Sequence, residues 1–124
     1  MRTFIAAKIH GVTVTACHLN YHGSQSLPAS RMQAVGIQPY EQVHVVNLKN
    51  GRRWVTYALI GPEGVCTLNG AAAHNGAVGD KLIVMTFALA EKYEPARVLF
   101  FTPDNRVRES LTYDREAAHD VAGA

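Results

Sequence analysis

A serine and several imidazoles near residue 20 are the first side chains whose types could support chemistry. Ser24 follows Gly23, but the G-x-S-x-G pattern of a hydrolase nucleophile elbow is absent, as are a phosphate-binding glycine loop and a C-x-x-C pair. His18 and His22 lie four residues apart, beside Cys17. Histidines at that spacing can share a metal on a helix, but this segment has the pattern of a strand end and a loop. We therefore predict no metal site.

Four segments carry a more specific pattern. They are Lys8-Ile9-His10, residues 19–24 (LNYHGS), residues 50–57 (NGRRWVTY) and residues 69–74 (NGAAAH). Their residue types, order and spacing closely resemble the aspartate 1-decarboxylase family, and the resemblance runs from Met1 to about Asn105. Gly79-Asp80 and Pro95 also fall where that family has them. A lone Gly-Ser pair would identify nothing, whereas several motifs in register make a strong signal.

The resemblance implies a cofactor that the chain makes from itself. The family folds as a double-psi β-barrel, mainly β with short helices, and assembles as a homotetramer with active sites between neighbouring subunits. Its precursor cleaves itself at Gly-Ser, which here gives a β chain of residues 1–23 and an α chain of residues 24–124. The Ser24 hydroxyl attacks the Gly23 carbonyl, an ester forms by an N-to-O acyl shift, and elimination and hydrolysis leave a covalent pyruvoyl group. Glycine suits that position because it tolerates a strained, close-packed backbone.

The same resemblance implies the chemistry of the mature site. The substrate amine forms a Schiff base with the pyruvoyl group, an electron sink that lets carbon dioxide leave. Tyr57 matches the family's proposed proton donor, and Thr56 matches the residue thought to stabilise the oxyanion during cleavage. Arg53 matches the arginine that grips a substrate carboxylate, which it can do bidentately. Thr56 is also matched to a substrate-binding role. The remaining matches are substrate-binding Lys8, Asn69, Gly70, Ala71 and Ala72, together with supporting His10 and Tyr21.

Backbone geometry sets limits on these assignments. Thr56 and Tyr57 are neighbours, so they point to opposite faces of the expected strand unless a bulge intervenes. Asn69 has a structural alternative as a helix cap, and Arg53 has one as a charged edge of a hairpin. The joint role of Thr56 and Tyr57 is therefore carried over from the family.

The chain departs from the family pattern around the cleavage position. His18 stands where an acidic residue is usual, and His22 replaces a residue that is often acidic or apolar. Gln25 follows the serine in place of a small or apolar residue, and Pro28 stands where an aspartate is expected. These changes leave open whether a maturation factor assists cleavage and which amino acid is the substrate.

The leading hypothesis is decarboxylation of L-aspartate to β-alanine and carbon dioxide, a step that feeds pantothenate synthesis in the family. One alternative is a paralogue that acts on another amino acid. A second is a barrel that never cleaves and serves as a binding or regulatory subunit. A third is an unrelated small β-barrel that serves as a binding module.

The elements that must position these residues are short. Apolar, β-branched runs with turn residues between them predict a small β-barrel. The expected strands cover residues 3–10, 12–15, 43–48, 53–60, 65–68, 81–88 and 97–101, with a hairpin turn at residues 49–51. One helix is expected from Pro28 or Ala29 to Val35, before Gly36, and one helical turn at residues 71–73 after Asn69 as its cap. Residues 109–124 are expected to form a frayed helix and a flexible tail.

Bulk properties indicate a small folded protein but give no function. The 124 residues favour a single domain over residues 1–124, and 48% hydrophobic with 18% charged residues is typical of globular proteins. A formal net charge of +2 is too even to suggest a nucleic-acid or membrane partner, and the resemblance implies a small-molecule amino-acid substrate instead. Lys8 interrupts the apolar stretch that a signal peptide needs, so we expect a cytoplasmic protein with reduced Cys17 and Cys66, most simply small core residues.

Overall fold

The computed structural model describes residues 1–20 and 23–114, and the fold in these ranges is mainly β. Its elements are β1 (Arg2–Thr13), β2 (Ala16–His18), β3 (Ser24–Pro28), α1 (Ala29–Val35), β4 (Gln42–Asn47), β5 (Arg53–Gly61), β6 (Thr67–Asn69), the 3₁₀ helix η1 (Gly70–Asn75), β7 (Lys81–Ala90), β8 (Ala96–Phe101) and β9 (Val107–Tyr113). The predicted mainly β class with short helices is confirmed.

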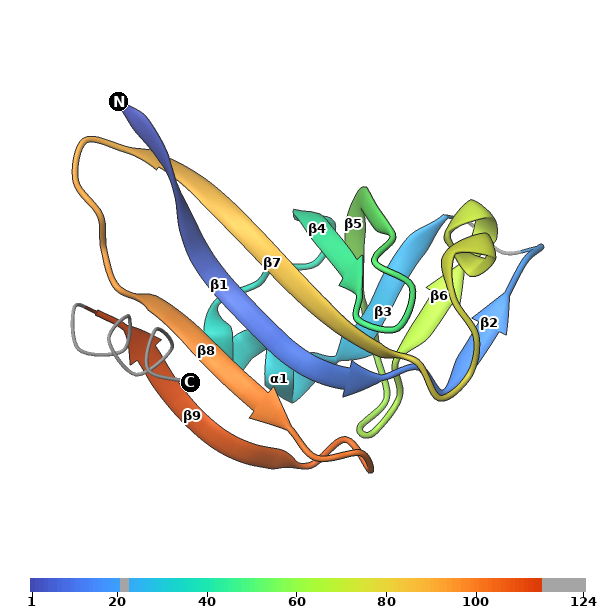
Figure 1. Ribbon diagram of the computed structural model, residues 1–124. Helices are drawn as coiled ribbons and strands as arrows, with labels where there is room; N and C mark the ends of the chain where they lie inside the picture. The colour runs from blue at the N-terminus through green and yellow to red at the C-terminus, as the bar shows by residue number, and fades with distance from the viewer. Residues whose placement is uncertain (21–22, 115–124) are drawn as a thin grey trace.

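All nine described strands join one mixed sheet in the order β2-β6-β3-β5-β4-β7-β1-β8-β9. The pairs β1/β8, β2/β6 and β3/β5 are parallel, and the other neighbours are antiparallel. The sheet is strongly curved and barrel-like, but β2 and β9 remain its two edges. Figure 1 shows the long strands β1 and β7 side by side, with the N-terminus at their upper left end.

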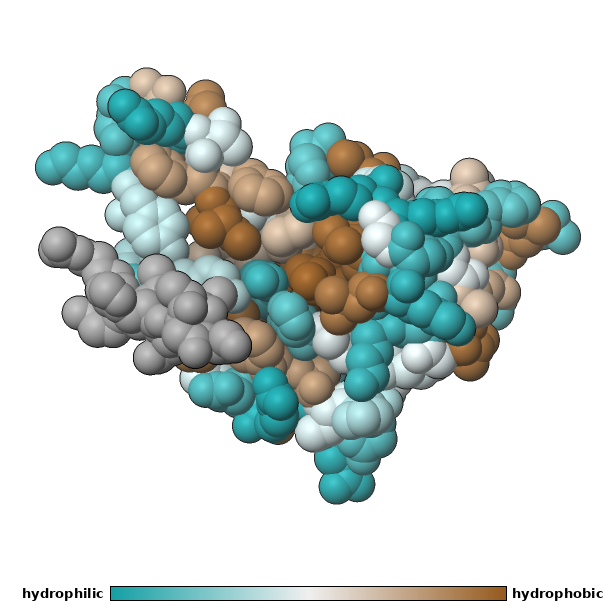
Figure 2. Space-filling view, viewed as in Figure 1, coloured by the Kyte–Doolittle hydropathy of each residue, from teal (hydrophilic) through white to brown (hydrophobic). Residues whose placement is uncertain are grey.

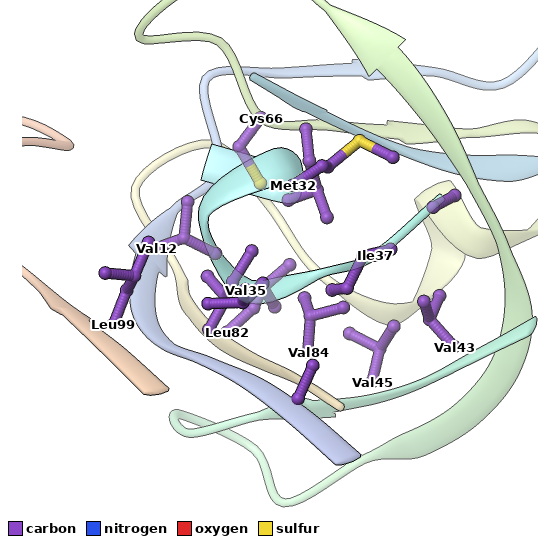
Figure 3. Packing of buried hydrophobic residues seen from close by; sticks show 14 of the residues in the cluster. Val12, Met32, Val35, Ile37, Val43, Val45, Cys66, Leu82, Val84 and Leu99 are labelled. Atoms are coloured by element: carbon purple, nitrogen blue, oxygen red, sulfur yellow. The ribbon is translucent and has the colours of Figure 1, made fainter. Parts of the chain in front are cut away.

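Alternating apolar residues build the core on one face of this sheet. Ile9, Val84 and Val45 form a row across β1, β7 and β4, and all three are fully buried. Met32 and Val35 of α1 pack against the same cluster, as Figure 3 shows. Each such side chain contributes roughly 1.5–3 kcal/mol by leaving water. Because the core occupies one face of the sheet, the opposite face is the one that can carry functional side chains.

The two helices differ in how well the sequence predicted them. Helix α1 ends where expected, because Gly36 adopts the left-handed conformation (φ 82°) and its N–H donates to the carbonyl of Gln33. The helical turn after Asn69 is the 3₁₀ helix η1, and the Asn69 side chain makes no capping hydrogen bond. The prediction of Asn69 as a cap is therefore wrong, since its amide bonds to serines of β3.

Several strand boundaries also differ from the prediction. The two expected N-terminal strands form one strand, β1, in which Gly11 (φ 86°) lies at a register shift between His10 and Val12. Strands β2, β3 and β9 were not expected. The prediction of a frayed helix from Glu109 is wrong as far as Tyr113, because these residues pair with β8 as strand β9. Residues 115–124 of the expected tail lie outside the described residues. Within the described residues, no helix has the length and hydrophobicity to cross a membrane.

Candidate active site

Five predicted site residues lie on the sheet face that is opposite the core, which we call the site face. They are Lys8, His10, Ser24, Arg53 and Tyr57. Arg53 and His10 share one row across β5, β4, β7 and β1, because Arg53 pairs with Val46, Val46 with Ile83, and Ile83 with His10. Paired residues of neighbouring strands point to the same side of a sheet. Strand pairing therefore brings residues 43 positions apart onto a common surface.

Lys8 and Ser24 reach the site face from opposite sides of β5. Lys8 belongs to the next row, since it pairs with Met85, which pairs with His44. Strand β3 runs parallel to β5 with Gln25 beside Ala58. The residues that precede these two, Ser24 and Tyr57, therefore both point to the site face.

Thr56 points the other way. It pairs with Val43, which is fully buried in the core, and the register between β4 and β5 is continuous from Gln42 to Val46. The bulge that would bring Thr56 and Tyr57 to one face is absent from this strand pair. Among the β5 residues predicted at the site, Thr56 is thus the one that does not reach the site face.

The Ser24 hydroxyl is buried beneath η1. Ser24 is 0% exposed and Asn69 is 2% exposed. Asn69 Nδ2 donates a hydrogen bond to Ser24 Oγ over 3.0 Å. Gly70 begins η1 in the left-handed conformation (φ 62°), and η1 packs against β2, β3, β5 and β6. Of the other η1 residues predicted at the site, Ala72 is buried and Ala71 is exposed.

Ser24 belongs to a group of four polar residues that we call the polar quartet. Its members are Ser24, Ser26, Thr67 and Asn69. In the antiparallel pair of β3 and β6, Ser24 lies opposite Asn69 and Ser26 lies opposite Thr67. Asn69 Nδ2 also donates to Ser26 Oγ over 2.9 Å, and Thr67 Oγ1 donates to Asn69 Oδ1 over 3.1 Å. The sequence did not single out Ser26 and Thr67, because no strand was expected at residues 24–28 to pair with the one expected at residues 65–68.

Gln25 lies on the core side of the same strands. Its Nε2 donates to the carbonyl of Thr67 over 3.1 Å and to Cys66 Sγ over 3.3 Å. Its Oε1 is buried and has no hydrogen-bond partner within the part of the chain that the structure describes. Burial raises the pKa of the Cys66 thiol to about 12. This cysteine is therefore an inert core residue, as predicted.

The end of η1 is held by the β4–β5 hairpin and by Asp80. Arg52 Nη1 donates to the carbonyl of His74, and Asn47 Nδ2 donates to the carbonyl of Asn75, each over 3.0 Å. Asp80 Oδ2 accepts from Asn47 Nδ2 over 2.9 Å and from the N–H of Ala77 over 3.0 Å. The hydrogen bond from Asn47, followed by that from Ala77, lowers the pKa of the Asp80 carboxyl. A buried carboxylate thus fixes the helix that covers Ser24.

Lys8 and His10 contact the two strands at the other end of the sheet. Lys8 Nζ donates to the hydroxyl of Tyr113 over 3.1 Å and lies 5.3 Å from the centre of the Tyr113 ring. The His10 ring lies 5.0 Å from that of Phe100. Burial, then the positive charges of Lys8 and Arg108, lower the pKa of His10.

Strand spacing separates the charged residues from Ser24 within one chain. Lys8 on β1 lies three strand positions from β5, which is about 14 Å at the usual spacing. Arg53 lies four residues from Tyr57 along β5, which is about 13 Å. One chain therefore brings together Ser24, Tyr57 and Asn69, and leaves Lys8 and Arg53 farther along the same face.

Gly23 lacks the strain that we expected. Its backbone is outside the left-handed region, and among residues 1–20 and 23–114 a Cβ built there would meet, beyond its chain neighbours, only the carbonyl oxygen of Asn69, at 4.0 Å. The expectation of a strained, close-packed glycine is therefore wrong for this conformation. Tyr21, predicted to support the cleavage loop, and His22 lie outside the described residues.

No three His, Cys, Asp or Glu side chains among residues 1–20 and 23–114 lie close enough together to hold a metal ion. His18 is exposed and lines a cavity of about 350 Å³ together with Ser26, Thr67 and Asn69. Figure 2 shows apolar residues at the surface beside polar ones. Three large apolar side chains on the site face are exposed: Val55, Phe87 and Leu89.

Comparison with known proteins identifies the family. The family model for aspartate decarboxylase matches residues 1–108. Similar proteins named aspartate 1-decarboxylase include those of Acaryochloris marina, 48% identical over 87% of this chain and 87% of the relative. Others are those of Desulfotalea psychrophila (40% identical; 88% and 97% covered) and Xanthobacter autotrophicus (42% identical; 100% and 85% covered). Matched over nearly its whole length, and with the motifs of β3, β5 and β6 gathered around one buried serine, this chain belongs to the aspartate decarboxylase family.

Proposed function

We propose that this chain is an aspartate 1-decarboxylase, a carboxy-lyase that converts L-aspartate to β-alanine and carbon dioxide. Its pyruvoyl group would come from Ser24 by self-cleavage after Gly23, and its place would be the cytosol, in the supply of β-alanine for pantothenate. The names of its relatives support this activity. The structural observation that carries it is the buried Ser24 hydroxyl, hydrogen bonded to Asn69 and on the same face as Tyr57.

The residues around Ser24 fit a pyruvoyl group. The site is closed to solvent at Ser24, and Asn69 Nδ2 already donates to the oxygen at this position. The same donor suits a carbonyl oxygen. When present, the group supplies an electron sink for the electrons left by departing carbon dioxide.

The acyl shift uses only atoms of the chain. Ser24 Oγ forms a bond to the Gly23 carbonyl carbon, its proton passes to the Ser24 nitrogen, and the peptide bond between Gly23 and that nitrogen breaks, so that an ester replaces an amide. Elimination would then break the bond between Cβ and Oγ of residue 24 and release the Gly23 carboxylate, and one water would displace the nitrogen as ammonia to leave the pyruvoyl group. Asn69 holds the attacking oxygen in place. Thr56 stays a prediction for the oxyanion role, although its strand position is on the core side.

We assign the two carboxylates of the substrate to cations at different places on the site face. L-Aspartate carries two carboxylates, and Arg53 and Lys8 are the cations that we assign to them. Tyr57 carries a phenolic O–H, and we assign it the delivery of a proton to the α-carbon after decarboxylation. Asn69, Gly70, Ala71 and Ala72 form the wall of η1 beside Ser24.

A homotetramer would complete this arrangement. Lys8 and Arg53 are each more than about 10 Å from the Ser24 region along the sheet of one chain. L-Aspartate is too short to bridge such a gap, so we propose that a neighbouring subunit supplies one of these cations. The exposed Val55, Phe87 and Leu89 on the site face favour cover by another chain.

The test is the denatured mass of the purified protein before and after warm incubation, with Ser24→Ala as the control. We expect fragments 1–23 and 24–124, the larger lighter by one ammonia than a serine-terminated chain, and β-alanine release from L-aspartate. Ser24→Ala stays whole and inactive. A wild-type chain that stays whole even with added cell extract, the source of any maturation factor, overturns the proposal. Faster turnover of L-glutamate or a neutral amino acid would instead favour a paralogue with another substrate.

A further inference from the structure

The side-chain amide of Asn69 is held at three points. Its nitrogen donates to Ser24 Oγ over 3.0 Å and to Ser26 Oγ over 2.9 Å. Its oxygen accepts from Thr67 Oγ1 over 3.1 Å. An amide nitrogen has two protons, so the two serines use both. Every contact of this amide within the polar quartet therefore has a distinct partner.

This pattern decides what Ser24 receives from Asn69. The terminal torsion of an asparagine has a broad, roughly two-fold energy profile, so neighbours must select one orientation of the amide. The Thr67 hydroxyl donates to the amide oxygen of Asn69 and so fixes where that oxygen lies. Ser26 accepts a hydrogen bond from the amide N–H that does not point to Ser24. Without these contacts, the amide can turn its oxygen toward Ser24 and no longer donates to the hydroxyl.

We propose that Ser26 and Thr67 are positioning residues for self-cleavage, which act through Asn69 to hold the Ser24 hydroxyl for attack. This inference rests on the proposed function. Neither residue touches the scissile bond, and each lies on the strand position opposite the other. Ser26 and Thr67 thus belong to the site because they orient the buried side-chain amide of Asn69.

The surroundings of the polar quartet suggest that loss of the Thr67 hydroxyl and loss of the Ser26 hydroxyl slow cleavage to different extents. Thr67 is anchored from two sides, since its carbonyl also accepts from the buried Gln25 Nε2 over 3.1 Å. Both residues line the cavity of about 350 Å³, but Ser26 is less buried than Thr67, which is 7% exposed. Water therefore replaces the hydroxyl that Ser26→Ala removes more readily than the hydroxyl of Thr67. Loss of the Thr67 hydroxyl should therefore slow cleavage more than loss of the Ser26 hydroxyl.

The experiment follows cleavage of the full chain after cell-free synthesis, by the decay of the intact band on a denaturing gel. We expect Thr67→Val to slow cleavage about tenfold and Ser26→Ala about threefold, the range that one hydrogen bond commands. Thr67→Ser restores the hydroxyl and should cleave near the wild-type rate. In the double variant the two effects should fall short of multiplying, because both act on one amide.

Thr86→Val is the matched control. Thr86 is a buried threonine of β7, 1% exposed, so the change removes a hydroxyl of the same kind far from the polar quartet. It should cleave at the wild-type rate even where its melting temperature falls as much as that of Thr67→Val. Equal cleavage rates for Thr67→Val, Thr86→Val and wild type would overturn the inference.

A second readout keeps the inference testable apart from the proposed function. If the wild-type chain never cleaves, the proposed function fails, and a role in cleavage fails with it. Exchange of the Asn69 side-chain protons, followed by nuclear magnetic resonance in Ser24→Ala chains, tests the orientation alone. We expect slow exchange with Thr67 present and exchange at least tenfold faster with Thr67→Val. Equal exchange in both would refute the positioning role even for a chain that cleaves.

Discussion

Replacing Asp80 by asparagine tests how firmly η1, the helix that covers Ser24, is anchored. The carboxylate accepts from Asn47 Nδ2 and from the N–H of Ala77, and it is 7% exposed. Asparagine has nearly the same shape and can place its oxygen on both donors. The change therefore removes the charge and keeps the geometry.

The expected loss follows from the two hydrogen bonds. Bonds to a charged acceptor contribute about 1.5–3 kcal/mol and neutral ones about 0.5–1.5 kcal/mol, so each bond loses about 1 kcal/mol. Lys49 adds little, because it lies 3.9 Å from the carboxylate and its side chain is 79% exposed. We expect Asp80→Asn to lower the free energy of unfolding by about 2 kcal/mol. For a chain of this length, that lowers the melting temperature by roughly 6–10 °C.

The assay compares thermal melts of wild type and Asp80→Asn from pH 7 to pH 3, at one protein concentration because assembly also affects stability. The folded state lowers the pKa of Asp80. Its stabilisation is therefore complete above the ordinary carboxyl pKa of about 3.9 and declines as the pH falls toward the lowered value. The difference between the two proteins should be constant from pH 7 to about 5 and shrink below about 4. A difference that is absent at pH 7, or unchanged at pH 3, would refute this reasoning.

Three further results are expected. Tyr57→Phe should still cleave at Ser24, but its release of β-alanine should fall at least about 100-fold, as for loss of a general acid; unchanged turnover would exclude Tyr57 as the proton donor. Native protein at pH 8 should leave Cys66 unalkylated by iodoacetamide, because burial raises its pKa to about 12, and unfolding should expose it to reaction. Because the pKa of His10 is lowered on folding, the unfolded chain binds a proton more readily below about pH 6.5, so stability falls as the pH drops. His10→Asn should lose less stability than wild type between pH 7 and 5, and parallel curves would contradict the assigned pKa shift.

The sequence was most informative where periodicity and turn residues agree. The β4–β5 hairpin forms around residues 49–51 as predicted, with the N–H of Gly51 bonded to the carbonyl of Asn47. The alternation rule also placed Thr56 and Tyr57 on opposite faces correctly. Both features depend on local geometry, which neighbouring residues specify.

The features that were missed depend on pairing between distant segments. Strand β3 contains Ser-Gln-Ser-Leu-Pro, a polar run that ends in proline, and only its position between β5 and β6 makes it a strand. Asn69 has the residue type of a cap, but its pairing opposite Ser24 directs its amide to the serines. The last expected helix became β9 because β8 offers it an edge. No local pattern reports such tertiary partners.

The open surroundings of Gly23 have a consequence for what would set the rate of the proposed cleavage. The backbone at Gly23 carries no left-handed strain next to the bond that we propose is cut. If the chain cleaves as proposed, the rate then depends on how often the Ser24 hydroxyl and the Gly23 carbonyl align, and not on the release of left-handed backbone strain at Gly23. Since a methyl group at position 23 finds space, the fold tolerates alanine there, and the chemistry at this bond can be varied while the rest of the molecule stays the same.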